Sequence, residues 1–174
     1  MKNQNMNFKK LAVNKEKLPE VYAFIEITKD SMVKYEIDPE TGFLMADRFL
    51  YTAMKFPFNY GFVPETKGED GDPVDIMVLS SEPIAHGAVV KSKIIGMLEM
   101  KDEEGIDTKL IAVPVKKIDP LYGVYEDITD IPAAVQERIK HFFDHYKELE
   151  PNKWVKTERF LNREAALKVL EKAL

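Results

Sequence analysis

The 174-residue chain contains no cysteine and no long hydrophobic run. Without cysteine there is no disulfide framework and no thiolate chemistry, which suits a reducing cytoplasm. No stretch approaches the roughly 18 consecutive apolar residues of a membrane-spanning helix. The polar, lysine-bearing residues 1–13 also lack the apolar segment of a signal peptide. We therefore expect a soluble, cytoplasmic protein with no membrane partner.

An excess of positive charge is missing as well. The chain has 25 Lys and Arg residues and 30 Asp and Glu residues, which gives a net charge of −5. General nucleic-acid-binding proteins show a basic surface, so we expect no nucleic-acid partner. Hydrophobic residues make up 45% of the chain, enough for a core of ordinary size. At this length we expect a single domain that covers residues 1–174.

The order of the expected elements indicates an α+β fold, mainly β. Residues 1–17 are polar and predict a short helix or a loose arm, and the aromatic residues 56–64 predict a rigid, buried loop. Patterns rich in β-branched and aromatic residues predict strands at 21–27, 32–37, 43–49, 76–79, 88–100, 110–115 and 154–160. Gly96 predicts a bend or bulge. Because the helices come last, we interpret the fold as a closed β-barrel with helices packed outside.

Two amphipathic helices are expected near the C-terminus. The first begins near Asp130 as N-cap with Pro132 in its first turn, and Pro151 ends it. Its apolar stripe is Val135, Ile139, Phe142, Tyr146 and Leu149. Asn162 caps the second helix, whose stripe is Ala166, Leu167, Leu170 and Leu174.

His141 and His145 share one face of the first helix. Their i, i+4 spacing can bind zinc, but no third ligand lies nearby in the sequence. We favour packing or a subunit contact for this pair.

Several acidic residues lie close together in the stretch Glu69-Asp70-Gly71-Asp72-Pro73-Val74-Asp75. Its Gly and Pro predict a turn, and the apolar run 76–79 places a buried strand directly after it. The like charges repel one another, so the turn is either solvated or binds hard cations such as Mg²⁺, Mn²⁺ or Ca²⁺. An EF-hand is excluded, because its sixth and twelfth positions require Gly and Glu, where this chain has Asp75 and Ser81.

Other charged residues are ambiguous when each is taken alone. Glu26 is the lone charge of an apolar strand, and we expect it to be exposed unless it serves a site. Strand alternation puts Lys34 and Glu36 on one face of a hairpin, with Arg48 near the end of its partner strand. Together these residues suggest phosphoryl transfer to water, since carboxylates bind metals, cations bind phosphate and a free carboxylate deprotonates water.

A larger set of matches points to one family. The stretch Asp70-Gly71-Asp72-Pro73-Val74-Asp75 reads in full as the signature D-[SGDN]-D-[PE]-[LIVMF]-D. Further matches, in order, are Lys34-Tyr35-Glu36, Asp47-Arg48-Phe49, Asn59-Tyr60-Gly61, residues 102–109 and residues 141–147. With these, the chain closely resembles the family I soluble inorganic pyrophosphatases in their shorter bacterial form. The resemblance runs from about residue 18 to the C-terminal helix.

The resemblance implies an OB-like closed β-barrel with flanking helices and a Mg²⁺-dependent hydrolysis of pyrophosphate to two phosphates by a metal-bridging water. It assigns several Mg²⁺ ions to Asp70, Asp75, Asp102, Asp107 and Glu36, with Glu26 supporting their shell. It assigns the role of base to Asp72. It assigns the two phosphates to Lys34, Arg48, Tyr60, Lys109, Tyr146 and Lys147.

The resemblance also implies a homohexamer built from two trimers, with the helix of His141 and His145 at subunit contacts. Phe56 departs from the family pattern, which has Tyr there. The hydroxyl that the family would hydrogen-bond within the carboxylate shell is therefore missing, which affects the tuning of that shell and not the reaction. Two rival classes are an OB barrel that binds single-stranded nucleic acid and a passive Ca²⁺-binding module. The acidic candidate face argues against the first, and only a phosphate-release assay separates the second.

Overall fold

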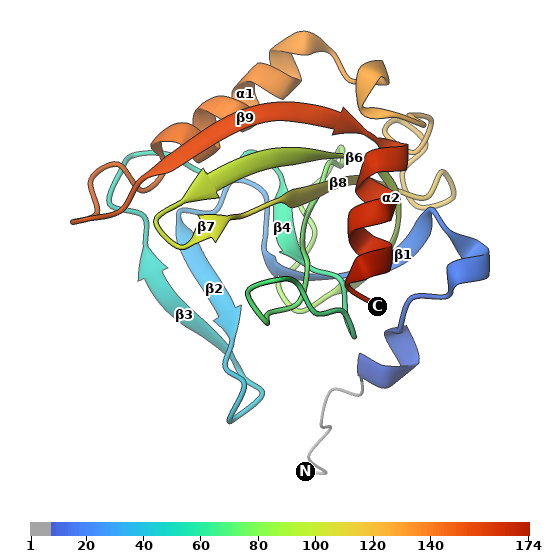
Figure 1. The fold of residues 1–174 in the computed structure, drawn as a ribbon, viewed down its shortest axis with the longest axis horizontal. Coiled ribbons are helices and arrows are strands. Elements are labelled where there is room, and N and C mark those ends of the chain that lie inside the picture. The colour runs from blue at the N-terminus through green and yellow to red at the C-terminus, as the bar shows by residue number, and fades with distance from the viewer. Residues whose placement is uncertain (1–7) are drawn as a thin grey trace.

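The structure, a computed structural model, describes residues 8–174 and is mainly β with few helices (Figure 1). Its strands are β1 (Glu20–Ile27), β2 (Val33–Ile37), β3 (Leu44–Phe49), β4 (Asn59–Phe62), β5 (Asp75–Val78), β6 (Val89–Asp102), β7 (Gly105–Ile106), β8 (Lys109–Pro114) and β9 (Val155–Asn162). Its helices are α1 (Ala133–His145) and α2 (Arg163–Lys172), with 3₁₀ turns η1 (Phe8–Leu11), η2 (Lys15–Lys17) and η3 (Ile128–Asp130). The arm expected at residues 1–17 lies partly outside the described residues.

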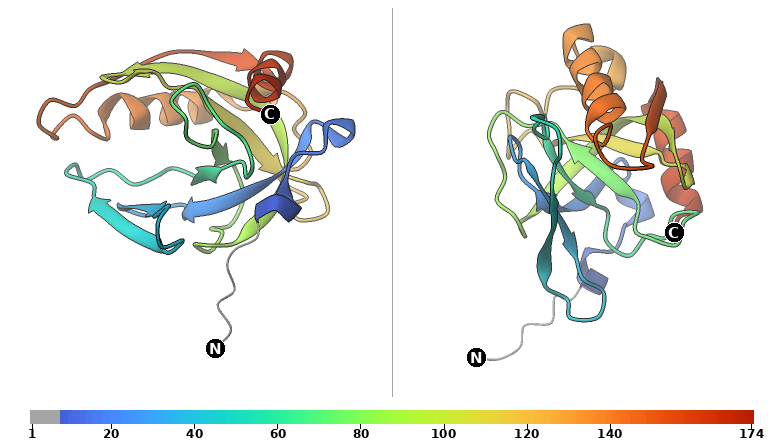
Figure 2. Two further views of the ribbon diagram at one scale, coloured as in Figure 1. Left: turned by 60° about the horizontal axis from the view of Figure 1, so that its bottom comes forward. Right: turned by 90° about the vertical axis from the view of Figure 1, so that its left-hand side faces the viewer.

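Seven strands form the main sheet, in the order β1-β4-β5-β8-β6-β7, with β9 on β6 and a further pairing of β1 with β6. All pairings are antiparallel except that of β5 with β8. The expected irregularity at Gly96 is confirmed, because the register of β6 against β8 shifts between Ile94 and Gly96. The hairpin of β2 and β3 forms a separate two-stranded sheet (Figure 2).

A close approach of β1 and β4 depends on one glycine. Gly61 pairs with Ile25, and a Cβ on Gly61 would lie 1.8 Å from the carbonyl oxygen of Phe24. No side chain fits at that distance, so only glycine allows this strand pairing. The pairing places β4, and with it Tyr60, against the strand that carries Glu26.

The core has two apolar clusters on the same strands, and β6 serves both. Ile95 and Leu98 pack in the cluster that contains Phe142 and Phe143 of α1. Ile94 and Met97 pack in the cluster that contains Ala166, Leu170 and other residues of α2 and β5. Strand β6, with its irregular register, thus supplies apolar side chains to the clusters of both helices, which lie outside the strands in Figure 1. No helix within residues 8–174 combines the length and apolarity needed to cross a bilayer.

The ends of the first helix differ from the prediction. Pro132 is the N-cap and has no side-chain cap, whereas Asp130 accepts hydrogen bonds from the backbone of Glu126 and Asp127 beside η3. The helix ends at His145, well before Pro151, and Leu149 is 61% exposed. The expected N-cap and the last core position were therefore wrong.

Two smaller expectations also need correction, and one is confirmed. Residues 56–64 are buried as expected, but they contain strand β4 instead of being loop throughout. Leu174 is exposed and does not belong to the core of α2. Asn162 is confirmed as the N-cap, since its side-chain oxygen accepts a hydrogen bond from the backbone of Ala165.

Candidate active site

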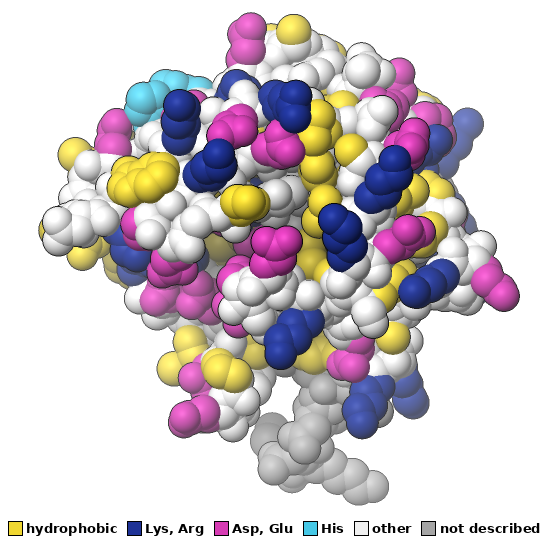
Figure 3. All heavy atoms as spheres, in the orientation of Figure 1, with side chains coloured by type: hydrophobic (Ala, Val, Ile, Leu, Met, Phe, Trp, Pro, Cys, Tyr) yellow, Lys and Arg dark blue, Asp and Glu magenta, His cyan; other side chains and the backbone are white. Residues whose placement is uncertain are grey.

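One cavity of about 400 Å³ brings together all thirteen residues assigned from the sequence. They come from the main sheet, the β2–β3 hairpin, the acidic turn and the end of α1. They are Glu26, Lys34, Glu36, Arg48, Tyr60, Asp70, Asp72, Asp75, Asp102, Asp107, Lys109, Tyr146 and Lys147. In Figure 3 acidic side chains lie side by side on the left of the face shown, near the positions of β7 and the β2–β3 hairpin. The cavity is lined by ten carboxyl and five cationic side chains.

The acidic turn is fixed by its own hydrogen bonds. The side chain of Asp70 accepts a bond from the backbone N–H of Asp72 (3.0 Å), and Gly68 donates to the carbonyl of Asp72 (2.7 Å). Gly71 adopts φ of +95°, a value that favours glycine. Partial burial, with the negative charges of Asp70 and Asp75, raises the pKa of Asp72. The turn thus holds a carboxyl whose proton affinity is higher than usual.

Lys109 lies buried between two of the predicted metal ligands. Its ammonium group donates hydrogen bonds to the carboxylates of Asp75 and Asp107. Burial acts to lower the pKa of Lys109, but the two carboxylates, Asp75 foremost, hold it well above its usual range. Burial raises the pKa of Asp107 despite this contact. The ammonium group thus partly offsets the repulsion between the two acids.

The donor set of the cavity fits Mg²⁺. Within residues 8–174 no three His, Cys, Asp or Glu side chains form a ready-made cage. Mg²⁺ does not require one, because it keeps several waters and binds through one or two carboxylates together with substrate phosphate. The predicted metal ligands are all carboxylates, and carboxylate oxygens favour hard cations such as Mg²⁺ over zinc or copper.

Glu26 is buried, so the expected exposure was wrong. Its side chain is covered by the hairpin, and Oε1 accepts a hydrogen bond from the backbone N–H of Ile37 (2.9 Å). Burial raises the pKa of Glu26 from 4.5 to about 7, with a further contribution from the charge of Asp75. Glu26 lines the cavity, which agrees with the other expectation for this residue, that it serves a site.

The cavity lining also includes a buried contact between a cation and a carboxylate. Lys147 donates a hydrogen bond to Asp102 (2.9 Å), and both side chains are less than 10% exposed. Burial acts to raise the pKa of Asp102, but the bonds from Lys147 and from the backbone of Glu104 hold it below its usual value. The Lys147 ammonium group is therefore fixed at the cavity wall.

Two tyrosines complete the lining. Burial raises the pKa of Tyr60 and of Tyr146, so both phenols stay protonated at neutral pH and can donate a hydrogen bond. Phe56 packs against both, with its ring centroid 5.7 Å from that of Tyr60 and 6.4 Å from that of Tyr146. The residue that departs from the family pattern therefore supports the wall from the core side.

Several lining residues were not predicted as part of a site. Asp47 accepts a hydrogen bond from Arg48 (2.6 Å) and belongs to a stretch that had already matched the family. Glu103 accepts a hydrogen bond from the backbone N–H of Trp154 and contacts Lys147 and Lys153. The pKa of Glu103 falls to about 2, because these contacts outweigh its partial burial. Nothing local in the sequence indicates Lys153, which reaches the cavity from a distant turn.

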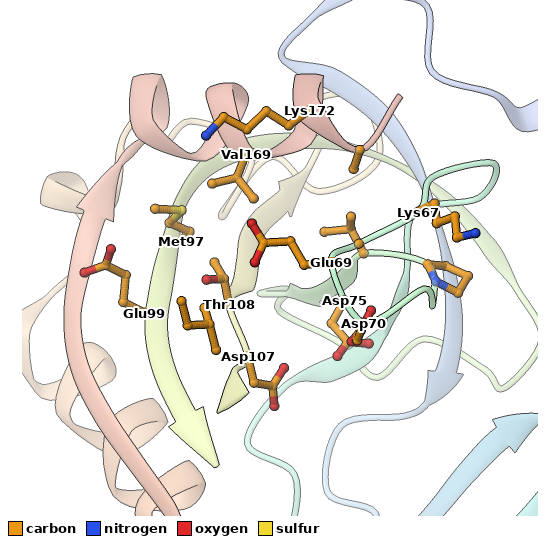
Figure 4. Close-up of a pocket in the computed structure, with 15 residues that line it drawn as sticks. Lys67, Glu69, Asp70, Asp75, Met97, Glu99, Asp107, Thr108, Val169 and Lys172 are labelled. Atoms are coloured by element: carbon orange, nitrogen blue, oxygen red, sulfur yellow. The ribbon is translucent and has the colours of Figure 1, made fainter. Parts of the chain in front are cut away.

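A second cavity of about 270 Å³ lies behind the acidic turn, between that turn, β6 and α2 (Figure 4). It shares Asp70, Asp75, Ile106 and Asp107 with the first cavity, and the three aspartates lie at the end away from α2. Met97 and Val169 form part of its apolar lining. The predicted metal ligands therefore form a wall between two cavities.

Comparison with known proteins gives consistent matches over nearly the whole chain. The profile of the family described as Inorganic pyrophosphatase matches residues 23–174. The inorganic pyrophosphatase of Aquifex pyrophilus is 52% identical over 97% of this chain and 96% of its own, and that of Helicobacter pylori is 53% identical over 97% of each. A crystal structure of the inorganic pyrophosphatase from Thermus thermophilus superimposes with a TM-score of 0.89 at 41% identity, covering 94% of both chains.

Proposed function

The chain belongs to the inorganic pyrophosphatase family, and we propose that the 400 Å³ cavity is where it hydrolyses pyrophosphate to two phosphates. The observation that carries this assignment is the lining of the cavity, in which carboxyl groups and cations face one space. Pyrophosphate is a polyanion, and attack by hydroxide is opposed by charge repulsion until both of its ends are neutralised.

Mg²⁺ is the cofactor of this proposal. Asp70, Asp75 and Asp107 would hold the tightest ion, and Asp102 and Glu36 would take part in binding further ions, with Glu26 as support. Bound there, Mg²⁺ lowers the pKa of the attacking water and neutralises charge on the phosphates. The contacts of Lys109 with Asp75 and Asp107 keep these carboxylates oriented into the cavity.

The cations and phenols would bind the two phosphates. Lys147 and Lys109 are held by carboxylates, so little side-chain freedom is lost when the substrate binds. Tyr60 and Tyr146 would donate hydrogen bonds from neutral hydroxyls, and Lys34 and Arg48 would bind from the hairpin. Asp72 would accept the proton of the attacking water, which its raised pKa favours.

The remaining parts of the proposal concern the fold and the assembly. The fold would be a closed OB-like barrel, because β1 pairs with β4 on one side and with β6 on the other. Residues 1–174 would form one domain, since both core clusters use the same strands. The working protein would be a cytoplasmic homohexamer, with the half-exposed face of His141 and His145 at a subunit contact.

The experiment is phosphate release from pyrophosphate with Mg²⁺ and, in parallel, with Ca²⁺. Ca²⁺ is larger and less strict in geometry, so it should bind yet fail to position the water. Release with Mg²⁺ alone is the expected result. Metal binding without any release would instead identify a passive cation-binding module. Salt-sensitive binding of single-stranded oligonucleotides without release would identify a nucleic-acid-binding barrel.

A further inference from the structure

Arg48 and Glu150 form an ion pair across 102 residues of sequence. Nε of Arg48 donates to Oε1 of Glu150 at 3.0 Å, and the Glu150 side chain is only 8% exposed. Arg48 belongs to β3 of the separate hairpin, and Glu150 belongs to the turns that follow α1. Figure 2 shows β3 and the loop between α1 and β9 at the same end of the molecule. This ion pair ties two parts of the fold that share no strand pairing.

The pair leaves part of the guanidinium group available. Arginine has five N–H donors; in Arg48 one is used by Glu150 and one, on Nη1, by Asp47 at 2.6 Å. Its side chain makes no other hydrogen bond within residues 8–174, and it lines the cavity. Three donors are thus left for an anion, and the two carboxylates fix the plane in which they lie.

We propose that Glu150 is a positioning residue that holds the Arg48 guanidinium ready for a phosphate of the substrate. This inference rests on the proposed function of the cavity. A free arginine side chain loses the freedom of several rotatable bonds when it binds an anion, which weakens binding. The buried carboxylate removes that freedom during folding, before the substrate arrives. Since a phosphate is bound in both ground and transition states, loss of the tether raises KM more than it lowers kcat.

The test compares Glu150→Gln with the matched control Glu148→Gln. Glu148 lies in the same turns, but its side chain is 53% exposed and contacts His145, not Arg48. Glu150→Gln should raise the KM for pyrophosphate by about tenfold or more and change kcat by less than about threefold, as expected for lost orientation of a binding group. Glu148→Gln should change KM by less than about twofold, because an exposed pair contributes little.

Repeating Glu150→Gln in an Arg48→Gln chain separates positioning from a general structural role. If Glu150 acts through Arg48, its replacement should change KM by less than about threefold in that background. The proposal is overturned if Glu150→Gln raises KM as much in the Arg48→Gln chain as in the natural chain. It is also overturned if Glu150→Gln raises KM by less than about threefold in the natural chain.

Calorimetric binding of methylenebisphosphonate with Mg²⁺ provides a second readout that does not need turnover. Glu150→Gln should weaken this binding, and Glu150→Asp, which keeps the charge on a shorter side chain, should restore part of it; unchanged binding in Glu150→Gln overturns the proposal. Failure of the natural chain to release phosphate would overturn the proposed function instead. Intact hydrolysis with no effect of Glu150 would overturn only the positioning role.

Discussion

The buried ammonium group of Lys109 donates a hydrogen bond to the carboxylate of Asp75 across the parallel strands β8 and β5. The register that pairs Leu110 with Ile76 sets these two side chains next to each other, one residue earlier on each strand. A second bond joins Lys109 to Asp107, two residues away on its own chain segment. The ammonium group and a bound cation would therefore compensate the same negative charges.

Lys109→Gln should destabilise the metal-free protein and increase its response to Mg²⁺. Without the ammonium group, the negative charges of Asp75 and Asp107 are no longer compensated. Removing one partner of a buried ion pair lowers the free energy of unfolding by about 3–5 kcal/mol. Denaturation in EDTA and then in Mg²⁺ measures both effects, and the gain in Tm on adding Mg²⁺ should exceed that of the natural chain. As a control, Lys168→Gln removes an exposed pair with Glu164 and should change little. Equal stability of Lys109→Gln and the natural chain in EDTA would contradict the prediction.

Glu26 should make the metal-free protein less stable as the pH rises. Its pKa is 4.5 when unfolded and about 7 when folded, so the native state holds the proton more tightly. The stability that this proton supplies is complete below about pH 4.5 and falls by about 1.4 kcal/mol per pH unit until about pH 7. Glu26→Gln cannot titrate, so its stability relative to the natural chain should rise across that window by up to about 3 kcal/mol. Urea denaturation in EDTA checks this, and parallel curves for the two proteins would refute it.

The parts of the site that follow local rules were predictable from the sequence. The turn with Gly71 and Pro73 put three acids at the start of a buried strand, and alternation put Lys34 and Glu36 on one face. These signals depend on neighbours in the chain, which the sequence displays directly. The same holds for the Asn162 cap of α2.

The parts that depend on distant contacts were not predictable. Glu26 is buried, and it accepts a hydrogen bond from the backbone of Ile37, which belongs to another sheet; its own strand gives no sign of that contact. The periodicity of Val135 to Leu149 continues past the end of α1, although the chain leaves the helix at His145 and so places Lys147 against Asp102. The pairing of Glu150 with Arg48 has no local signal at all.

Phe56→Tyr should leave the protein folded and change kcat/KM by less than tenfold, equivalent to about 1.4 kcal/mol. Phe56 is buried and its ring packs against those of Tyr60 and Tyr146, so the added hydroxyl would lie among side chains that support the cavity and not in the cavity itself. Phe58→Tyr is the matched control, since Phe58 is equally buried but packs on Tyr122. Its ring pairs with Tyr122 and not with Tyr60 or Tyr146, so Phe58→Tyr should lower Tm through the cost of a buried hydroxyl and leave kcat/KM unchanged. A hundredfold change in kcat/KM for Phe56→Tyr in either direction would show that the position is misjudged.

Asp72→Asn should separate proton transfer from metal binding. The backbone N–H of Asp72, not its side chain, donates the hydrogen bond to Asp70 that holds the turn, so the amide leaves the turn intact. The amide cannot accept the proton of the attacking water, and turnover at neutral pH should fall by roughly 10²–10⁴ at an unchanged Mg²⁺ requirement. Asp70→Asn and Asp75→Asn should instead raise the Mg²⁺ concentration needed for half-maximal activity, because each removes a charged ligand. A Mg²⁺ titration of all three variants decides the matter. If Asp72→Asn needs as much Mg²⁺ as Asp75→Asn and then turns over at a near-normal rate, Asp72 is a ligand and the base is another group.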